Sequence, residues 1–190
     1  MYKIQQGTED LNSNGGIVLT GALLNSLKSL EKIDQMETGT VKSGWTPHSG
    51  ILKTSAGLLT LGRSDFADIE LFRKDRLFRD SLGLKRVSSE GTLRQRLEGI
   101  ADQNEDQTLL DDANVELLSK VDHFGMEQTE HCNYVPLDID VSVQNNSGSK
   151  KEGVSWTYKN LDGYAPIFAY VGTDGYMLAN ELRNGSQQSA

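Results

Sequence analysis

The chain has 190 residues, 36% of them hydrophobic, and a formal net charge of −8. This length accommodates one full domain or one domain with a small appendage, and the acidic charge argues against a grip on nucleic acid along the whole sequence. No apolar run approaches the ~20 residues of a membrane helix, and the N-terminus lacks a signal-peptide pattern. The one cysteine, Cys132, excludes an internal disulfide. We therefore expect a cytoplasmic protein without membrane contact.

The first predicted region, 1–50, comprises a flexible start, a helix and a linker. After Gly15 and Gly16, apolar residues recur at helical spacing, at Leu23, Leu27, Leu30 and Ile33. The stretch ETGTVKSGWTPHSG (37–50) is rich in glycine, serine and threonine, which predicts a loop.

We expect the second region, 51–125, to be helical. It opens with an apolar stripe at helical spacing, formed by Ile51, Leu52, Leu58 and Leu59. Ser64 is the expected N-cap of the following helix, and Ser88 or Ser89 is the expected N-cap of the next one. Apolar spacing predicts a last helix over 106–122.

Basic residues concentrate in the middle of this helical region, where they slightly outnumber the acidic ones between 63 and 98. The stretch SSEGTLRQRL (88–97) carries Arg94 and Arg96, and arginine contacts phosphates and base edges, so this is a candidate DNA-recognition helix. The two arginines do not share a helix face, and a solvated helix surface explains them equally well.

The pattern becomes sheet-forming at VPLDIDVSV (135–143). Because successive side chains of a strand point to opposite faces, Asp138 and Asp140 share one face, and Leu137, Ile139 and Val141 are expected to pack on the other. Two explanations of the acidic face remain open. It faces water, or it directs paired carboxylates at a metal ion or a proton-transfer site.

A polar insert, QNNSGSKKEGVSWTYKNLDGY (144–164), follows this strand. It brings Lys150 and Lys151 close in sequence to aromatic residues, a combination that suits the backbone and bases of a nucleic acid; a long solvated loop is the alternative. Two strand-like runs, APIFAYV (165–171) and YMLANELR (176–183), then complete the chain. Helices first and strands last predict an α+β fold.

The run LDIDVSV, followed by NNSGSKKEGVSWTYKNLDGYAPIFAYVGTDGYMLANELRNGSQ, resembles insertion-sequence transposases of the DDE class, which have a ribonuclease-H-like core. The upstream stretch LLTLGRSDFADIELFRKDRLFRDSLGLKRVSSEGTLRQRLEGI is similar to the N-terminal part of the same proteins. The resemblance covers about 14–187. It implies that 134–190 begins the catalytic core, with the first three strands of its sheet, and that 51–125 binds DNA.

In that family the first strand of the core carries the first acidic residue of the catalytic triad, in a pattern of Asp followed two residues later by Thr or Ser. Asp140-Val141-Ser142 matches the pattern. The resemblance therefore implies that Asp140 is catalytic and binds metal, with Asp138 as a second candidate ligand and Mg²⁺ as the cofactor.

The partner implied by the resemblance is DNA, at the terminal inverted repeats of the element, bound by a possible homo-oligomer. The expected DNA contacts are Arg94, Arg96, Lys150 and Lys151.

The sequence departs from the family in one respect. The second aspartate and the glutamate of the triad lie downstream of the third strand, and no residue here can be assigned to either role. We therefore expect an N-terminal portion of a transposase, from a truncated or frameshifted copy, with an incomplete sheet and no activity alone. The complete family enzymes cleave and join DNA strands with divalent metal. The alternative is a non-catalytic DNA-binding protein that occupies the transposon ends.

Overall fold

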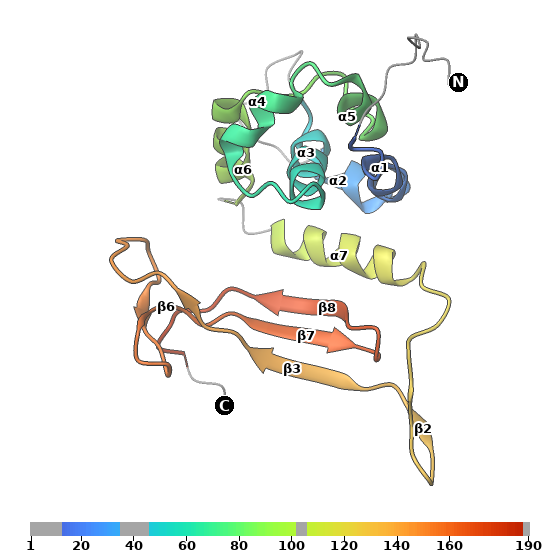
Figure 1. Cartoon of the computed structure of the whole chain (residues 1–190), viewed down its shortest axis with the longest axis vertical. Coiled ribbons are helices and arrows are strands. Elements are labelled where there is room, and N and C mark those ends of the chain that lie inside the picture. The colour runs from blue at the N-terminus through green and yellow to red at the C-terminus, as the bar shows by residue number, and fades with distance from the viewer. Residues whose placement is uncertain (1–12, 35–45, 102–105, 188–190) are drawn as a thin grey trace, which may run out of the picture. The chain divides into compact units, whose positions relative to one another are not determined.

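The computed structural model describes residues 13–34, 46–101 and 106–187, and divides the chain into two compact units, Met1–Ala113 and Asn114–Ala190 (Figure 1). The first unit is helical in its described part, and the second contains three small antiparallel sheets. This mixture of helices and antiparallel sheets confirms the expected α+β fold. None of the helices in the described ranges is long and apolar enough to cross a membrane.

The described part of the N-terminal unit contains short helices. They are α1 (Ile17–Asn25), α2 (Ser29–Ile33), α3 (His48–Thr60), the 3₁₀ helix η1 (Phe66–Asp68), α4 (Ile69–Phe72), α5 (Arg76–Ser81) and α6 (Glu90–Ala101). A further helix, α7 (Asp106–Leu118), crosses the boundary between the units and ends four residues before the expected end. The loop expected over 37–50 lies mostly outside the described residues, and its last three residues begin α3.

One apolar cluster forms the core of this unit, and α3 contributes Ile51 and Leu58 to it. The rings of Phe72 and Phe78 stack within the same cluster, with centroids 4.9 Å apart. Leu59 was expected on the buried stripe but is exposed, because it follows Leu58 by about 100° around the helix and points away from the cluster.

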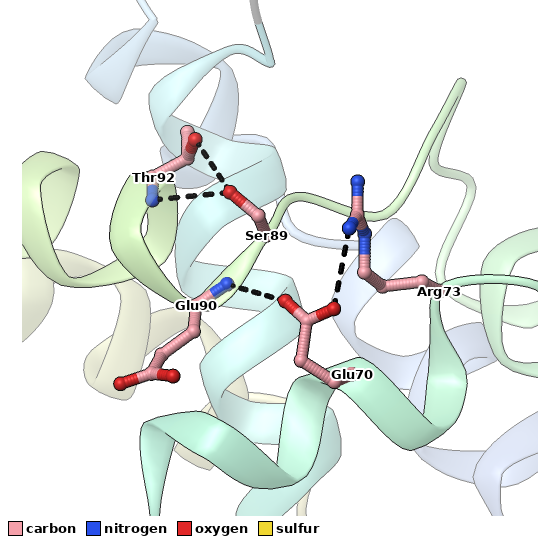
Figure 2. A network of polar contacts seen from close by, with 5 residues as sticks. All are labelled: Glu70, Arg73, Ser89, Glu90 and Thr92. Atoms are coloured by element: carbon pink, nitrogen blue, oxygen red, sulfur yellow. Dashed lines mark hydrogen bonds and ion pairs between the residues drawn. The ribbon is translucent and has the colours of Figure 1, made fainter.

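Side-chain caps hold the starts of η1 and α6. The expected cap at Ser64 is wrong by one residue: Asp65 accepts a hydrogen bond from the backbone N–H of Ala67, 2.9 Å away. The cap expected at Ser89 is confirmed, because its Oγ accepts from the N–H of Thr92 at 3.4 Å (Figure 2). Both side chains satisfy a backbone donor that has no partner within the helix itself.

Glu70 fixes the start of α6 to α4. One oxygen of its carboxylate accepts from the backbone N–H of Glu90 at 3.0 Å, and the other contacts Nη1 of Arg73 at 3.2 Å (Figure 2). The hydrogen bond from Glu90 and the charge of Arg73 hold the pKa of Glu70 below its usual value. This network positions α6, the helix that carries both candidate DNA-contacting arginines.

The C-terminal unit is built from three sheets. The largest consists of β3 (Leu137–Val141), β7 (Ile167–Val171) and β8 (Tyr176–Glu181) in the order β3-β7-β8 (Figure 1). The insert is a sheet too, with the order β4 (Gln144–Asn145), β6 (Asp162–Tyr164), β5 (Ser155–Trp156). A third antiparallel pair, β1 (Glu127–Gln128) and β2 (Asn133–Tyr134), precedes β3 along the chain.

The packing expected on the apolar face of β3 is wrong for two of its three residues. Leu137 and Ile139 are 55% and 62% exposed, and only Val141 is buried. The reason is the place of β3 in the sheet. It is an edge strand that pairs with β7 alone, so its side chains have cross-strand neighbours on one side only.

Candidate functional site

The two aspartates of β3 lie on one face of the largest sheet. Asp138 stands opposite Tyr170 of β7, and Asp140 stands opposite Phe168. Directly opposed residues of antiparallel strands project to the same face, so both carboxylates lie beside this aromatic pair, whose ring centroids are 6.3 Å apart. Both aspartates are exposed. The alternation predicted from the sequence therefore places them as expected.

Strand β8 adds no carboxylate to this face. In the row that begins with Asp140 and continues through Phe168, the β8 residue is Asn180. Glu181 belongs to the next row, with Val141, and so projects from the opposite face. The acidic face thus presents two aspartates and an amide.

A pair of divalent ions needs more fixed ligands than this. Within the described part of the chain, no three His, Cys, Asp or Glu side chains come close enough together to hold a metal ion. Asp138 and Asp140 are suitable oxygen ligands by chemistry. The described residues nevertheless do not fit a complete two-metal site.

A hydrogen bond ties the insert to the end of β3. The hydroxyl of Tyr158 donates to the carbonyl oxygen of Val141 at 3.2 Å. The turn that carries Tyr158 is closed by two bonds from buried Thr157, whose N–H and Oγ1 both donate to the carbonyl of Leu161 at 2.9 Å. Asn160 ends this turn with φ of 59°, a conformation that asparagine tolerates better than most residues.

A concavity of about 520 Å³ lies next to this turn. It is lined by Trp156, Thr157, Tyr158, Asn160, Gly185, Ser186 and Gln187. Its floor is held by close packing, because a Cβ atom on Gly185 would overlap the carbonyl oxygens of Ser155 and Gly163. The N–H of Ser186 also donates to Oγ of Ser155 at 2.9 Å. The sequence offered no signal for this concavity.

A second concavity, of about 380 Å³, lies in the N-terminal unit. Its lining is formed by Thr46, Pro47, Ser49, Gly50, Lys53, Gly83, Leu84, Lys85 and Arg86. Three of these side chains are cationic and come from α3 and from the segment before α6. Such a basic concavity can bind an anion such as phosphate.

The three cationic residues of this concavity differ in their ion pairing from four arginines elsewhere in the unit. Arg63, Arg73, Arg79 and Arg94 each form an ion pair with a carboxylate, at N–O distances between 2.7 and 3.9 Å. Lys85 and Arg86 form no ion pair with any described residue. Lys53 donates to the amide oxygen of Asn25, an uncharged partner, at 2.9 Å. The sequence prediction did not include Lys53, which is distant in sequence from its neighbours.

Arg94 and Arg96 lie in different environments. Arg94 is exposed, contacts Glu90 at 3.3 Å and lies over the Phe66 ring, 5.0 Å from its centroid. Arg96 is only 3% exposed. Its burial lowers the pKa of its guanidinium, and the nearby Asp34 opposes that shift. The DNA-contact role expected for Arg96 does not suit this position, because a buried guanidinium presents no surface to a phosphate.

The other two expected DNA contacts, Lys150 and Lys151, are exposed in the loop between β4 and β5. They belong to the C-terminal unit, as do Asp138 and Asp140, whereas Arg94 belongs to the N-terminal unit. Each unit therefore presents at least one of the expected basic residues on its surface.

The sequence was compared with known protein families, curated proteins and solved structures. A family model described as "Transposase DDE domain group 1" matches residues 3–190. No significant match is found among curated proteins or among solved structures. Because the matched region is almost the entire sequence, the chain belongs to the group 1 family of transposase DDE domains.

Proposed function

We propose that this chain acts in metal-dependent DNA strand cleavage and transfer during transposition, with Asp140 as a catalytic carboxylate and Asp138 as its neighbour in metal binding. The observation that carries the proposal is the exposure of both aspartates on one face of β3, in a chain of the transposase DDE family. The match of Asp140-Val141-Ser142 to the family pattern supports the assignment to Asp140 rather than Asp138.

The chemistry explains why carboxylates are needed. Negative charge spreads over the phosphodiester oxygens in the transition state, and divalent cations held by carboxylates stabilise it; Mg²⁺ is the proposed ion. Two aspartates are too few to hold two ions. The proposal therefore requires further carboxylates from outside the residues described here, and the 190-residue chain alone is inactive in strand cleavage.

The sheet order supports the proposal for 134–190. Three neighbouring antiparallel strands in the order β3-β7-β8, with the acidic residues on the first, agree with the beginning of a ribonuclease-H-like core. In that arrangement β3 and β8 are edge strands, and an edge strand can pair with further strands. Additional segments that complete the metal site can join the sheet at an edge, or a second copy can do so.

A second candidate function is DNA binding without cleavage, at the terminal inverted repeats of the element. It is favoured by the concavity that contains Lys53, Lys85 and Arg86, together with exposed Arg94. Phosphates bound there would release counterions, so the affinity would fall steeply with salt. This function belongs to the helical region and does not require Asp140.

One experiment separates the two functions. The chain is incubated with a labelled duplex of the element's terminal repeat, with Mg²⁺ or Mn²⁺, and both a mobility shift and strand cleavage are scored. A shift without cleavage supports DNA binding by the chain without catalysis. Restored cleavage on addition of a complementing C-terminal segment, and its loss in Asp140→Ala, supports the catalytic role. Restored cleavage that survives Asp140→Ala refutes that role.

A further inference from the structure

Two aromatic side chains of the insert are exposed to solvent. Trp156 and Tyr158 are 59% and 61% exposed, on either side of buried Thr157. Trp156 ends β5 and Tyr158 lies in the turn that follows, and both side chains line the 520 Å³ concavity. The hydroxyl of Tyr158 donates to the carbonyl oxygen of Val141 at 3.2 Å, which restrains the position of that ring while 61% of the residue stays exposed.

The surroundings of the two rings are polar and basic. Asn160, Ser186 and Gln187 supply hydrogen-bonding groups to the same concavity. The ammonium group of Lys159 lies 5.8 Å from the centre of the Tyr158 ring. The insert contains Lys150, Lys151 and Lys159 against Glu152 and Asp162, whereas the whole chain has a net charge of −8. A locally basic surface on an acidic protein favours an anionic partner.

We propose that Trp156 and Tyr158 form a stacking platform for an unpaired DNA base, whose flanking phosphates are contacted by the lysines of the insert. The identity of the partner as DNA rests on the proposed function. A base fits a concavity of this size, and every base has a π face on which an indole or phenol ring can stack.

The position of the platform gives it a role next to the reacting strand. Tyr158 is bonded to Val141, the residue that follows Asp140 in β3. A base unpaired near a cleavage point would thus be held beside the carboxylate assigned to catalysis. Duplex DNA keeps its bases stacked inside the helix, so the platform selects for single-stranded or unpaired nucleotides.

The test uses the full chain and two strands that differ only in their bases. The probes are a labelled single-stranded oligothymidylate of about twelve nucleotides, within the usual site sizes for single strands, and an abasic sugar-phosphate strand of equal length. Binding is measured by fluorescence anisotropy at low salt. The variants are Trp156→Ala, which removes the larger ring, and Tyr134→Ala, an exposed tyrosine of β2 that serves as the matched control.

We expect Trp156→Ala to weaken binding of the oligothymidylate about 5- to 150-fold and to leave binding of the abasic strand within about twofold. Trp156→Phe should keep most of the affinity, because a phenyl ring still stacks. Tyr134→Ala should change neither affinity. Trp156 is more than half exposed, so its removal leaves the core intact, and circular dichroism of each variant checks this.

Three outcomes overturn the proposal: an equal loss for both strands, no loss for either, or no binding of the oligothymidylate by the parent chain. Failure of the proposed function is seen separately, as absence of binding to the terminal-repeat duplex. That duplex contact is assigned to the N-terminal unit, so a chain that loses it can still discriminate the two single strands through Trp156.

Discussion

The hydroxyl of Tyr158 donates a hydrogen bond of 3.2 Å to the carbonyl oxygen of Val141, and so connects the inserted sheet to the strand that carries both aspartates. The two residues are 17 positions apart, and the intervening segment forms β4 and β5. This contact turns an insert that the sequence could equally assign to a solvated loop into a structure with a defined place beside Asp140.

The first prediction concerns catalysis. The purified 190-residue chain should not nick or join a terminal-repeat duplex with Mg²⁺ or Mn²⁺, because Asp138 and Asp140 are too few ligands for two ions. Gel analysis of labelled duplex measures this. Strand nicking by the chain alone that disappears in Asp140→Ala would contradict the incomplete metal site.

The second prediction separates Arg94 from Arg96. Arg96→Ala should lower the free energy of unfolding by roughly 3 kcal/mol, because it removes a buried guanidinium that faces Asp34. Arg94→Ala should change stability by less than about 1 kcal/mol, because its ion pair is exposed, and should weaken duplex binding instead. Urea denaturation and a mobility shift, applied to both variants, give the comparison. Equal stability of the two variants would mean that Arg96 is not buried in solution.

The third prediction is a loss of stability below about pH 6.5. Burial lowers the pKa of His48, the charge of Arg96 lowers it further, and Asp34 opposes them. The unfolded chain then binds a proton that the folded chain does not, so stability falls as pH drops below the unfolded pKa of about 6.5 and continues to fall until the folded pKa is reached.

Thermal unfolding at pH 7.5 and pH 5.5 measures this effect. His48→Gln should reduce the difference between the two pH values, whereas His131→Gln, at an exposed position, should leave it unchanged. A pH dependence identical in the parent and in His48→Gln would show that another group is responsible.

The fourth prediction tests the packing at the floor of the larger concavity. Gly185→Ala should destabilise the C-terminal unit by roughly 1–3 kcal/mol, because its new methyl group would overlap two backbone carbonyl oxygens that cannot move easily. Gly91→Ala is the matched control. It lies in α6 with no atom near its Cβ position, and should stabilise the chain by about 0.5–1 kcal/mol. Urea titration should show changes of opposite sign in the free energy of unfolding of the two variants. A change of the same sign in both would refute the close packing around Gly185.

The fifth prediction concerns the basic concavity. The double variant Lys85→Gln, Arg86→Gln should weaken duplex binding and reduce the slope of log affinity against log salt by about 0.9 for each phosphate that the variant no longer neutralises. Lys74→Gln, at an exposed lysine that does not line the concavity, should leave the slope nearly unchanged. An unchanged slope in the double variant would remove this concavity from the DNA-binding surface.

Local patterns in the sequence determined much of the architecture. Helical spacing predicted α3, α6 and α7, and the serine before Glu90 predicted the start of α6. Apolar spacing and capping can be recognised in a sequence because each depends on residues within one or two helical turns. Strand alternation likewise placed Asp138 and Asp140 on one face, and the acidic pattern together with the following motifs indicated the family.

Only the tertiary structure decided which residues are accessible. Arg96 follows Leu93 by three positions and precedes Ile100 by four, so its spacing on the buried face of α6 was a signal that the sequence contained, but its charge favoured the opposite interpretation. Leu137 and Ile139 were expected to be buried, yet they are exposed because β3 lies at the edge of its sheet.

Neither concavity could be predicted from the sequence, and the physical reason is the same for both. Lys53 lines one concavity with Lys85 and Arg86, and Trp156 lines the other with Gly185, although the segments are about 30 residues apart in the sequence. Hydrophobic periodicity and capping report neighbours within one element, whereas these concavities depend on how separate elements pack. The sequence by itself therefore determined the elements and the family, and the packing of those elements decided where charged and aromatic side chains gather.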